Sequence, residues 1–189
     1  MKIRILAMVF LVCAALLPED RACAKEMTPL DIPMIGDIQM KKVGDVAPPF
    51  VLTDLEGKPF DLSKSVAEKV HLLVSWSIFC EPCGEEMPLI EKLYQEYKEK
   101  GLDVLGISMD GEPMKKSVQG MARQKGYTFR QFIDTLAEDE SFVVADPFGV
   151  AGTPTLYLLD RTGKIVLAEV GRTSKEALEE AVKKALEAK

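Results

Sequence analysis

The chain has 189 residues, of which 24 are Lys or Arg and 30 are Asp or Glu, so its formal net charge is −6 at pH 7. An acidic chain is repelled by nucleic acid and by anionic membrane surfaces, which excludes both as expected partners. The length suffices for one domain with a substantial core, and we find no internal repeat or low-complexity tract.

Residues 1–24 have the pattern of an export signal. Two basic residues precede an uncharged apolar run over residues 5–17, and Ala22-Cys23-Ala24 supplies small residues for cleavage. This run is short for a membrane span, which needs about 20 residues. We therefore expect a cleaved signal and a periplasmic or extracytoplasmic protein, with a membrane anchor formed by the uncleaved segment as the alternative. Cleavage removes three basic and two acidic residues, which takes the net charge from −6 to −7.

Residues 25–42 mix Pro, Gly and charge, and they predict either a linker or a docked arm before a domain over 43–189. Residues 47–52 predict a strand, and a turn at 54–58 leads to a second short strand at 60–62. The nearly continuous apolar run Val70–Trp76 predicts a strand that is buried on both faces.

A helix is expected from the Cys80-Glu81-Pro82-Cys83 motif to about Lys100, where Gly101 can end it. A buried strand at 102–109 follows, and Pro113 and Gly126 bracket the next helix.

The last third of the chain begins with a long acidic loop, expected over Phe132–Pro147. Two strands, at 155–159 and 164–170, should pair around a turn, and an amphipathic helix at 174–189 closes the chain. The order predicts an α/β domain with a mixed central sheet flanked by helices, extended by strands at its N-terminus and by an insertion in its middle.

Cys80 and Cys83 are the only cysteines outside the predicted signal, and they lie where a strand gives way to a helix. So small a loop would stabilise a fold very little, but a helix N-terminus stabilises the thiolate that attacks disulfides. The adjacent Glu81 partly opposes thiolate formation, which favours a reducing pair over a strongly oxidising one. No His follows Cys83 and no second Cys pair exists, which excludes haem attachment and a zinc-finger site; we expect no metal or other cofactor. The single histidine, His71, begins a predicted buried strand and is expected at a core or edge position there, not as a metal ligand.

Together these features resemble the thioredoxin fold, and within it the TlpA/ResA-like branch of exported thiol-disulfide oxidoreductases. The resemblance covers residue 43 to the C-terminus. Besides the CxxC motif, it rests on segments distributed along that region: 43–50, 54–58, 76–79, Glu86-Met87-Pro88 and Gly149-Val150-Ala151-Gly152-Thr153-Pro154-Thr155.

The resemblance implies a cis peptide bond between Thr153 and Pro154 that faces the Cys pair and leaves the Thr153 backbone free to bind an extended client. Thioredoxins carry a buried acid six residues before the first Cys, where this chain has Val74. Glu86, one helical turn beyond Cys83, is the candidate acid that takes its place. The alternative interpretation of Glu86 is a solvated acid in the first turns of the helix.

Two aromatic residues near the motif are candidates for client binding. Phe79 precedes the catalytic turn and is expected to be exposed. Trp76 is expected either to cover the disulfide and meet the client or to pack in the core.

The predicted function is reduction of client disulfides, with Cys80 attacking, Cys83 resolving and Glu86 assisting deprotonation. The resemblance implies apocytochrome c as client and a membrane thiol electron donor as partner. One alternative reverses the direction and makes the protein an oxidase or isomerase of secreted proteins. Another, a peroxiredoxin-like peroxidase, would use the Ser77 hydroxyl but lacks the required upstream Pro. A non-catalytic module that binds thiol-bearing partners is the third.

Overall fold

The computed structural model describes residues 39–188, and the predicted signal and most of the predicted linker lie outside them. The core is a five-stranded sheet in the order β5-β4-β3-β6-β7. Strands β3, β4 and β5 are parallel, whereas β6 runs antiparallel to both β3 and β7, so the sheet is mixed, as predicted. The strands are β3 (Val70–Trp76), β4 (Leu102–Ser108), β5 (Arg130–Ile133), β6 (Thr155–Leu159) and β7 (Ile165–Val170).

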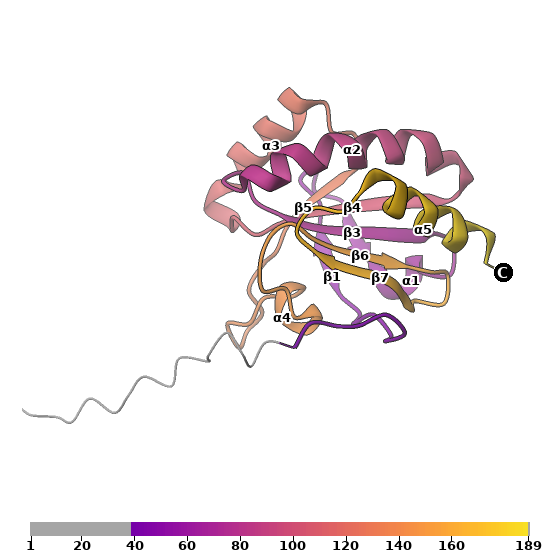
Figure 1. Ribbon diagram of the computed structural model, residues 1–189. Helices are drawn as coiled ribbons and strands as arrows, with labels where there is room; N and C mark the ends of the chain where they lie inside the picture. The colour runs from indigo at the N-terminus through magenta and orange to yellow at the C-terminus, as the bar shows by residue number, and fades with distance from the viewer. Residues whose placement is uncertain (1–38, 189) are drawn as a thin grey trace, which may run out of the picture. The chain divides into compact units, whose positions relative to one another are not determined.

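Three helices cover one face of this sheet: α2 (Glu81–Tyr97), α3 (Lys115–Lys125) and α5 (Lys175–Glu187). Helix α2 connects the parallel strands β3 and β4, and α3 connects the parallel strands β4 and β5. Because both crossover connections have the same handedness, both helices lie on the same face of the sheet (Figure 1). The apolar faces of these three helices pack in the core between them and the sheet, with Met87 from α2, Val118 from α3 and Val182 from α5. Short 3₁₀ turns, η2 (Lys98–Lys100) and η3 (Glu112–Met114), end α2 and precede α3.

The opposite face packs against the N-terminal part of the domain and a short helix from the insertion (Figure 1). Strands β1 (Val51–Thr53) and β2 (Pro59–Asp61) form an antiparallel hairpin, followed by α1 (Leu62–Ser65). Helix α4 (Ala145–Phe148) brings Phe148 into the same core. The end of the predicted linker is docked here, since the Lys41 N–H donates to the Phe148 carbonyl at 3.0 Å.

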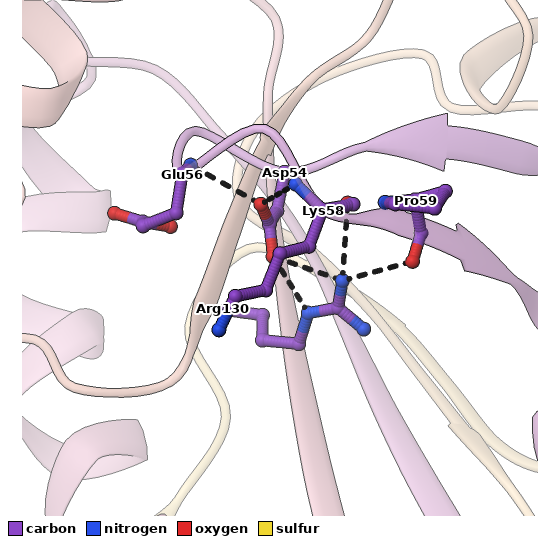
Figure 2. Close-up of polar contacts among 5 residues, drawn as sticks. All are labelled: Asp54, Glu56, Lys58, Pro59 and Arg130. Atoms are coloured by element: carbon purple, nitrogen blue, oxygen red, sulfur yellow. Dashed lines mark hydrogen bonds and ion pairs between the residues drawn. The ribbon is translucent and has the colours of Figure 1, made fainter.

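A partly buried ion pair between Asp54 and Arg130 fastens the hairpin to the edge of the sheet (Figure 2). Asp54 accepts from Arg130 Nε at 3.1 Å and Nη2 at 2.9 Å, and its other oxygen accepts the N–H groups of Glu56 and Lys58. The guanidinium group also donates to the carbonyl of Pro59 at 3.4 Å. The hairpin is therefore held to β5 by polar contacts as well as by apolar packing.

The sequence prediction was wrong for two stretches. The first strand begins at Val51, not at residue 47. Phe132 is not in a loop: it is fully buried in β5, the edge strand that the prediction missed. The acidic insertion begins only after Ile133 and contains an antiparallel bridge between Leu136 and Phe142. Among residues 39–188, no helix is both long and apolar enough to cross a membrane.

Candidate active site

The Cys80–Cys83 pair forms a disulfide at the N-terminus of α2, so the structure shows the oxidised form. Cys80 is the N-cap residue, and its Sγ accepts a hydrogen bond from the Cys83 N–H at 3.2 Å. Cys80 is half-buried, whereas Cys83 is only 1% exposed. A client can therefore approach the first sulfur, while the second is covered by the protein.

Glu86 lies one turn beyond Cys83 on the same side of α2 and is 3% exposed. The alternative interpretation of Glu86, a solvated acid in the first turns of the helix, is thus wrong. Its carboxylate accepts the backbone N–H of Thr173 at 3.3 Å. Burial raises the pKa of Glu86 above its ordinary value, and the Thr173 hydrogen bond opposes that rise. Such a group is suited to accept a proton close to the Cys pair.

The peptide bond between Thr153 and Pro154 is cis, as the resemblance implied. Thr155, which follows the cis bond, pairs with Ser75 near the C-terminal end of β3. The cis bond therefore lies at the end of the central strands from which the chain continues to Cys80. Thr153 is half-buried, and Pro154 is buried.

The segment between β7 and α5 connects the cis-proline loop to α2. The Gly171 N–H donates to the Pro154 carbonyl at 2.8 Å, and two residues later Thr173 donates to Glu86. Between them, Arg172 forms an ion pair with Glu85. This segment carries partners of Glu86 that the sequence analysis missed, because a backbone N–H leaves no signal in the residue type.

The two aromatic candidates differ in exposure. Phe79 is 77% exposed and adjoins the disulfide, in agreement with the expectation. Trp76 is 2% exposed, and its Nε1–H donates to Gln131 Oε1 at 3.1 Å in the core. The structure corrects the expectation that Trp76 meets the client, because an indole hydrogen-bonded beneath the surface offers no contact area.

One further side chain reaches the site without having been predicted. Asp110, just after β4, accepts hydrogen bonds from the Ser77 hydroxyl at 2.6 Å and the Ile78 N–H at 3.0 Å. The Ser77 hydroxyl, which a peroxidase would direct at its substrate, thus donates to a carboxylate instead. The sequence did contain a signal for Asp110, an acidic residue shortly after a buried strand. The C-terminal ends of parallel strands lie together at one end of the sheet, where binding sites form.

Comparison with known proteins agrees with this geometry. The profile of the Redoxin family matches residues 42–186. The thiol-disulfide oxidoreductase ResA of Bacillus thuringiensis (strain Al Hakam) is 36% identical over 149 residues, which are 79% of this chain and 82% of the relative. ResA of Geobacillus kaustophilus (strain HTA426) is 38% identical over 137 residues, 72% of this chain and 74% of the relative.

Solved structures show the same fold. The thioredoxin domain of a thiol-disulfide oxidoreductase from Bacteroides vulgatus aligns with a TM-score of 0.64 and 27% identity, covering 76% of this chain and 97% of that domain. A thiol:disulfide interchange protein from Bacteroides sp. aligns with a TM-score of 0.63 and 26% identity, covering 78% of this chain and 91% of that protein. The chain therefore belongs to the Redoxin family, and within it to the TlpA/ResA-like thiol-disulfide oxidoreductases, as its sequence predicted.

Proposed function

We propose that this protein reduces disulfide bonds in client proteins outside the cytoplasm, with Cys80 as the attacking thiol and Cys83 as the resolving thiol. The observation that carries the assignment is the contrast in burial: Cys80 is half-buried at a helix N-terminus, and Cys83 is 1% exposed behind it. The thiolate is the nucleophile in disulfide exchange, and the accessible N-cap sulfur is the better placed of the two.

In the first step, the Cys80 thiolate attacks one sulfur of the client disulfide. The client S–S bond breaks, a mixed disulfide forms through Cys80, and the second client sulfur leaves as a thiolate that takes up a proton. Thr153 and Pro154 would align an extended client segment here, and Phe79 would contact it. The exposure of Phe79 supports that contact.

In the second step, Cys83 gives its proton to Glu86 and attacks Cys80 Sγ. The bond to the client breaks, the client leaves with a second thiol, and the Cys80–Cys83 disulfide forms. The client has then gained two electrons and two protons, and the enzyme has lost them. The buried position of Glu86 and its raised pKa support its role as proton acceptor.

A dithiol donor in the membrane would restore the reduced enzyme by the same exchange, becoming a disulfide itself. The signal pattern of residues 1–24 supports a location where cytosolic thiols do not reach the protein. The resemblance to the TlpA/ResA-like branch favours apocytochrome c as the client, since its two haem-binding cysteines must be reduced before haem is attached.

The test is to trap the client. The full chain carrying Cys83→Ser, expressed in cells and quenched with N-ethylmaleimide, should accumulate a mixed disulfide through Cys80, with the client identified by mass spectrometry. The double variant Cys80→Ser/Cys83→Ser is the control and should trap nothing. Absence of any Cys80-linked client would contradict the mechanism, and a client other than an apocytochrome would contradict only the proposed substrate.

A further inference from the structure

The residues between β3 and α2 form a tight turn in which the backbone N–H groups of Ile78, Phe79 and Cys80 each have a partner. The Cys80 N–H donates to the Ser77 carbonyl at 3.2 Å, which closes the turn. The Phe79 N–H donates to Ser77 Oγ at 3.1 Å, and the Ile78 N–H donates to Asp110 Oδ2 at 3.0 Å. The turn therefore depends on two side chains, Ser77 and Asp110.

Asp110 lies just after the neighbouring strand β4 and is fixed to its end. Its Oδ2 also accepts the hydroxyl of Ser108 at 2.7 Å, and its own N–H donates to Ser108 Oγ at 3.2 Å. Ser108 is fully buried at the end of β4. The remaining oxygen, Oδ1, accepts the Ser77 hydroxyl at 2.6 Å, which also orients Ser77 Oγ toward the Phe79 N–H.

Three donors thus converge on one carboxylate, and two of them belong to the turn that ends at Cys80. Hydrogen bonds to an ionised acceptor are the strong ones among protein hydrogen bonds. The contacts join the catalytic turn to β4, a strand that itself pairs with β3 over seven residues. Cys80 is held from its N-terminal side by this anchor and from its C-terminal side by α2.

We propose that Asp110 is a positioning residue of the exchange reaction: it holds the turn over residues 77–80 so that Cys80 Sγ stays at the N-terminus of α2. During the cycle this sulfur changes partner from Cys83 to the client and back, so the disulfide itself cannot hold it throughout. The anchor keeps the reduced thiolate beside the N–H groups that stabilise it. The inference rests on Cys80 as attacking thiol and applies to either direction of exchange.

The variants are chosen to separate positioning from folding. Asp110→Ala removes all three acceptor contacts, and Ser77→Ala removes only those made by the hydroxyl. Asp110→Asn preserves most of the geometry, because its carbonyl can accept from Ile78 and its amide can donate to Ser77 Oγ. The matched control is Asp160→Ala, which removes an acid that anchors the β6–β7 turn in the same way, by accepting from Thr162 N, Thr162 Oγ1 and Lys164 N.

The measurements are the rate of iodoacetamide alkylation of Cys80 in the reduced protein at neutral pH, and kcat and KM for reduction of insulin disulfides with dithiothreitol as the reductant that regenerates the dithiol. Asp110→Ala should lower both the alkylation rate and kcat about tenfold with KM changed less than about twofold, because the thiolate loses its fixed place while client contacts remain. Asp110→Asn should recover most of the rate. Asp160→Ala should lose thermal stability and keep the wild-type alkylation rate.

A wild-type alkylation rate and kcat in Asp110→Ala would overturn the positioning role. If that variant does not fold, Ser77→Ala decides the matter: a fall of several-fold in alkylation supports the anchor, and an unchanged rate overturns it. Alkylation of the wild-type protein first at Cys83 would overturn both this inference and the proposed function, whereas a reactive Cys80 that is indifferent to Asp110 and Ser77 would overturn the inference alone.

Discussion

The carboxylate of Glu86 accepts a hydrogen bond from the backbone N–H of Thr173, 87 positions later in the chain. This contact joins the helix that carries the Cys pair to the segment whose Gly171 binds the carbonyl of the cis-proline. The proton acceptor and the client-binding loop of the proposed mechanism are therefore tied to one short segment between β7 and α5.

Replacing Glu86 by Gln should slow resolution. Gln keeps an oxygen for the Thr173 N–H but cannot take the proton of Cys83, so kcat should fall about a hundredfold. The mixed disulfide with a client should accumulate, as seen on non-reducing gels. The matched control is Glu99→Gln at an exposed residue of η2, beyond the far end of α2, which should keep wild-type turnover. Equal turnover of Glu86→Gln and wild type would remove Glu86 from the mechanism.

The same substitution should stabilise the fold at neutral pH. Because burial raises the pKa of Glu86 in the folded protein, the folded state holds this proton more tightly than the unfolded chain, and stability from this group is lost as pH rises through the folded pKa. Glu86→Gln should thus show a higher free energy of unfolding than wild type near pH 7, with the difference shrinking below pH 4.5, the ordinary value. Urea unfolding at both pH values tests this, and a difference independent of pH would contradict it.

Phe79→Ala should weaken client binding without affecting the fold. The side chain is 77% exposed, so its removal costs little stability, whereas burial of a Phe side chain against a client is worth enough to change KM about tenfold. A small disulfide that does not reach Phe79 should react at the wild-type rate. Val46→Ala serves as control, since Val46 is 65% exposed and bridges to Lys164 at the opposite end of the sheet. An unchanged KM for protein clients would exclude the contact.

The contacts of Asp54 shown in Figure 2 should contribute far more to the free energy of unfolding than those of an ordinary surface carboxylate. Asp54→Ala removes the carboxylate partner of Arg130 and the side-chain acceptor of two backbone N–H groups, and we expect a loss of about 3 kcal/mol in the free energy of unfolding. Asp61→Ala, on the same hairpin, removes the pair with the exposed Lys64 and the N-cap hydrogen bonds from Ser63, and it should cost about 1 kcal/mol. Similar losses for the two variants in chemical denaturation would contradict this role of Asp54.

His71 should make stability depend on pH in the opposite sense to Glu86. Its ring is fully buried and within hydrogen-bond distance of Ser65 Oγ at 2.8 Å and the Lys69 carbonyl at 3.0 Å. Burial lowers its pKa below 6.5 against the opposing charge of Asp103, so the unfolded chain binds the proton better. Stability is therefore lost as pH falls below about 6.5 toward the folded value. His71→Asn should flatten this dependence between pH 7.5 and 5.5, and parallel curves for the two proteins would contradict it.

Much of the fold could be predicted from sequence because its central strands are apolar on both faces. Val70–Trp76 was predicted with the bounds that the structure shows. Strand β5 was missed because Arg130 and Gln131 interrupt its apolar pattern: Arg130 pairs with Asp54, and Gln131 binds Trp76. Partners far away in the chain explain both polar residues, and no local pattern can reveal them.

Some residues of the candidate active site could likewise be predicted from the sequence, and others could not. Cys80 and Cys83 carry signals in residue type and spacing, whereas the cis Thr153–Pro154 bond was expected from the resemblance to the TlpA/ResA-like branch. Burial of Trp76 and the role of Asp110 depend on which side chains meet after folding. The missed contacts at the site are those that cross between strands or use the backbone.

The central claim is that the Cys80–Cys83 pair acts as a reductant, and its reduction potential tests that claim most directly. The protein would be equilibrated with redox buffers and the fraction of dithiol measured. We expect a value near or below that of thioredoxin, about −270 mV, because Glu81 beside the N-cap sulfur disfavours the reduced thiolate. A value near that of a strong oxidase, about −120 mV, would show that the pair donates disulfides and would contradict the proposed direction.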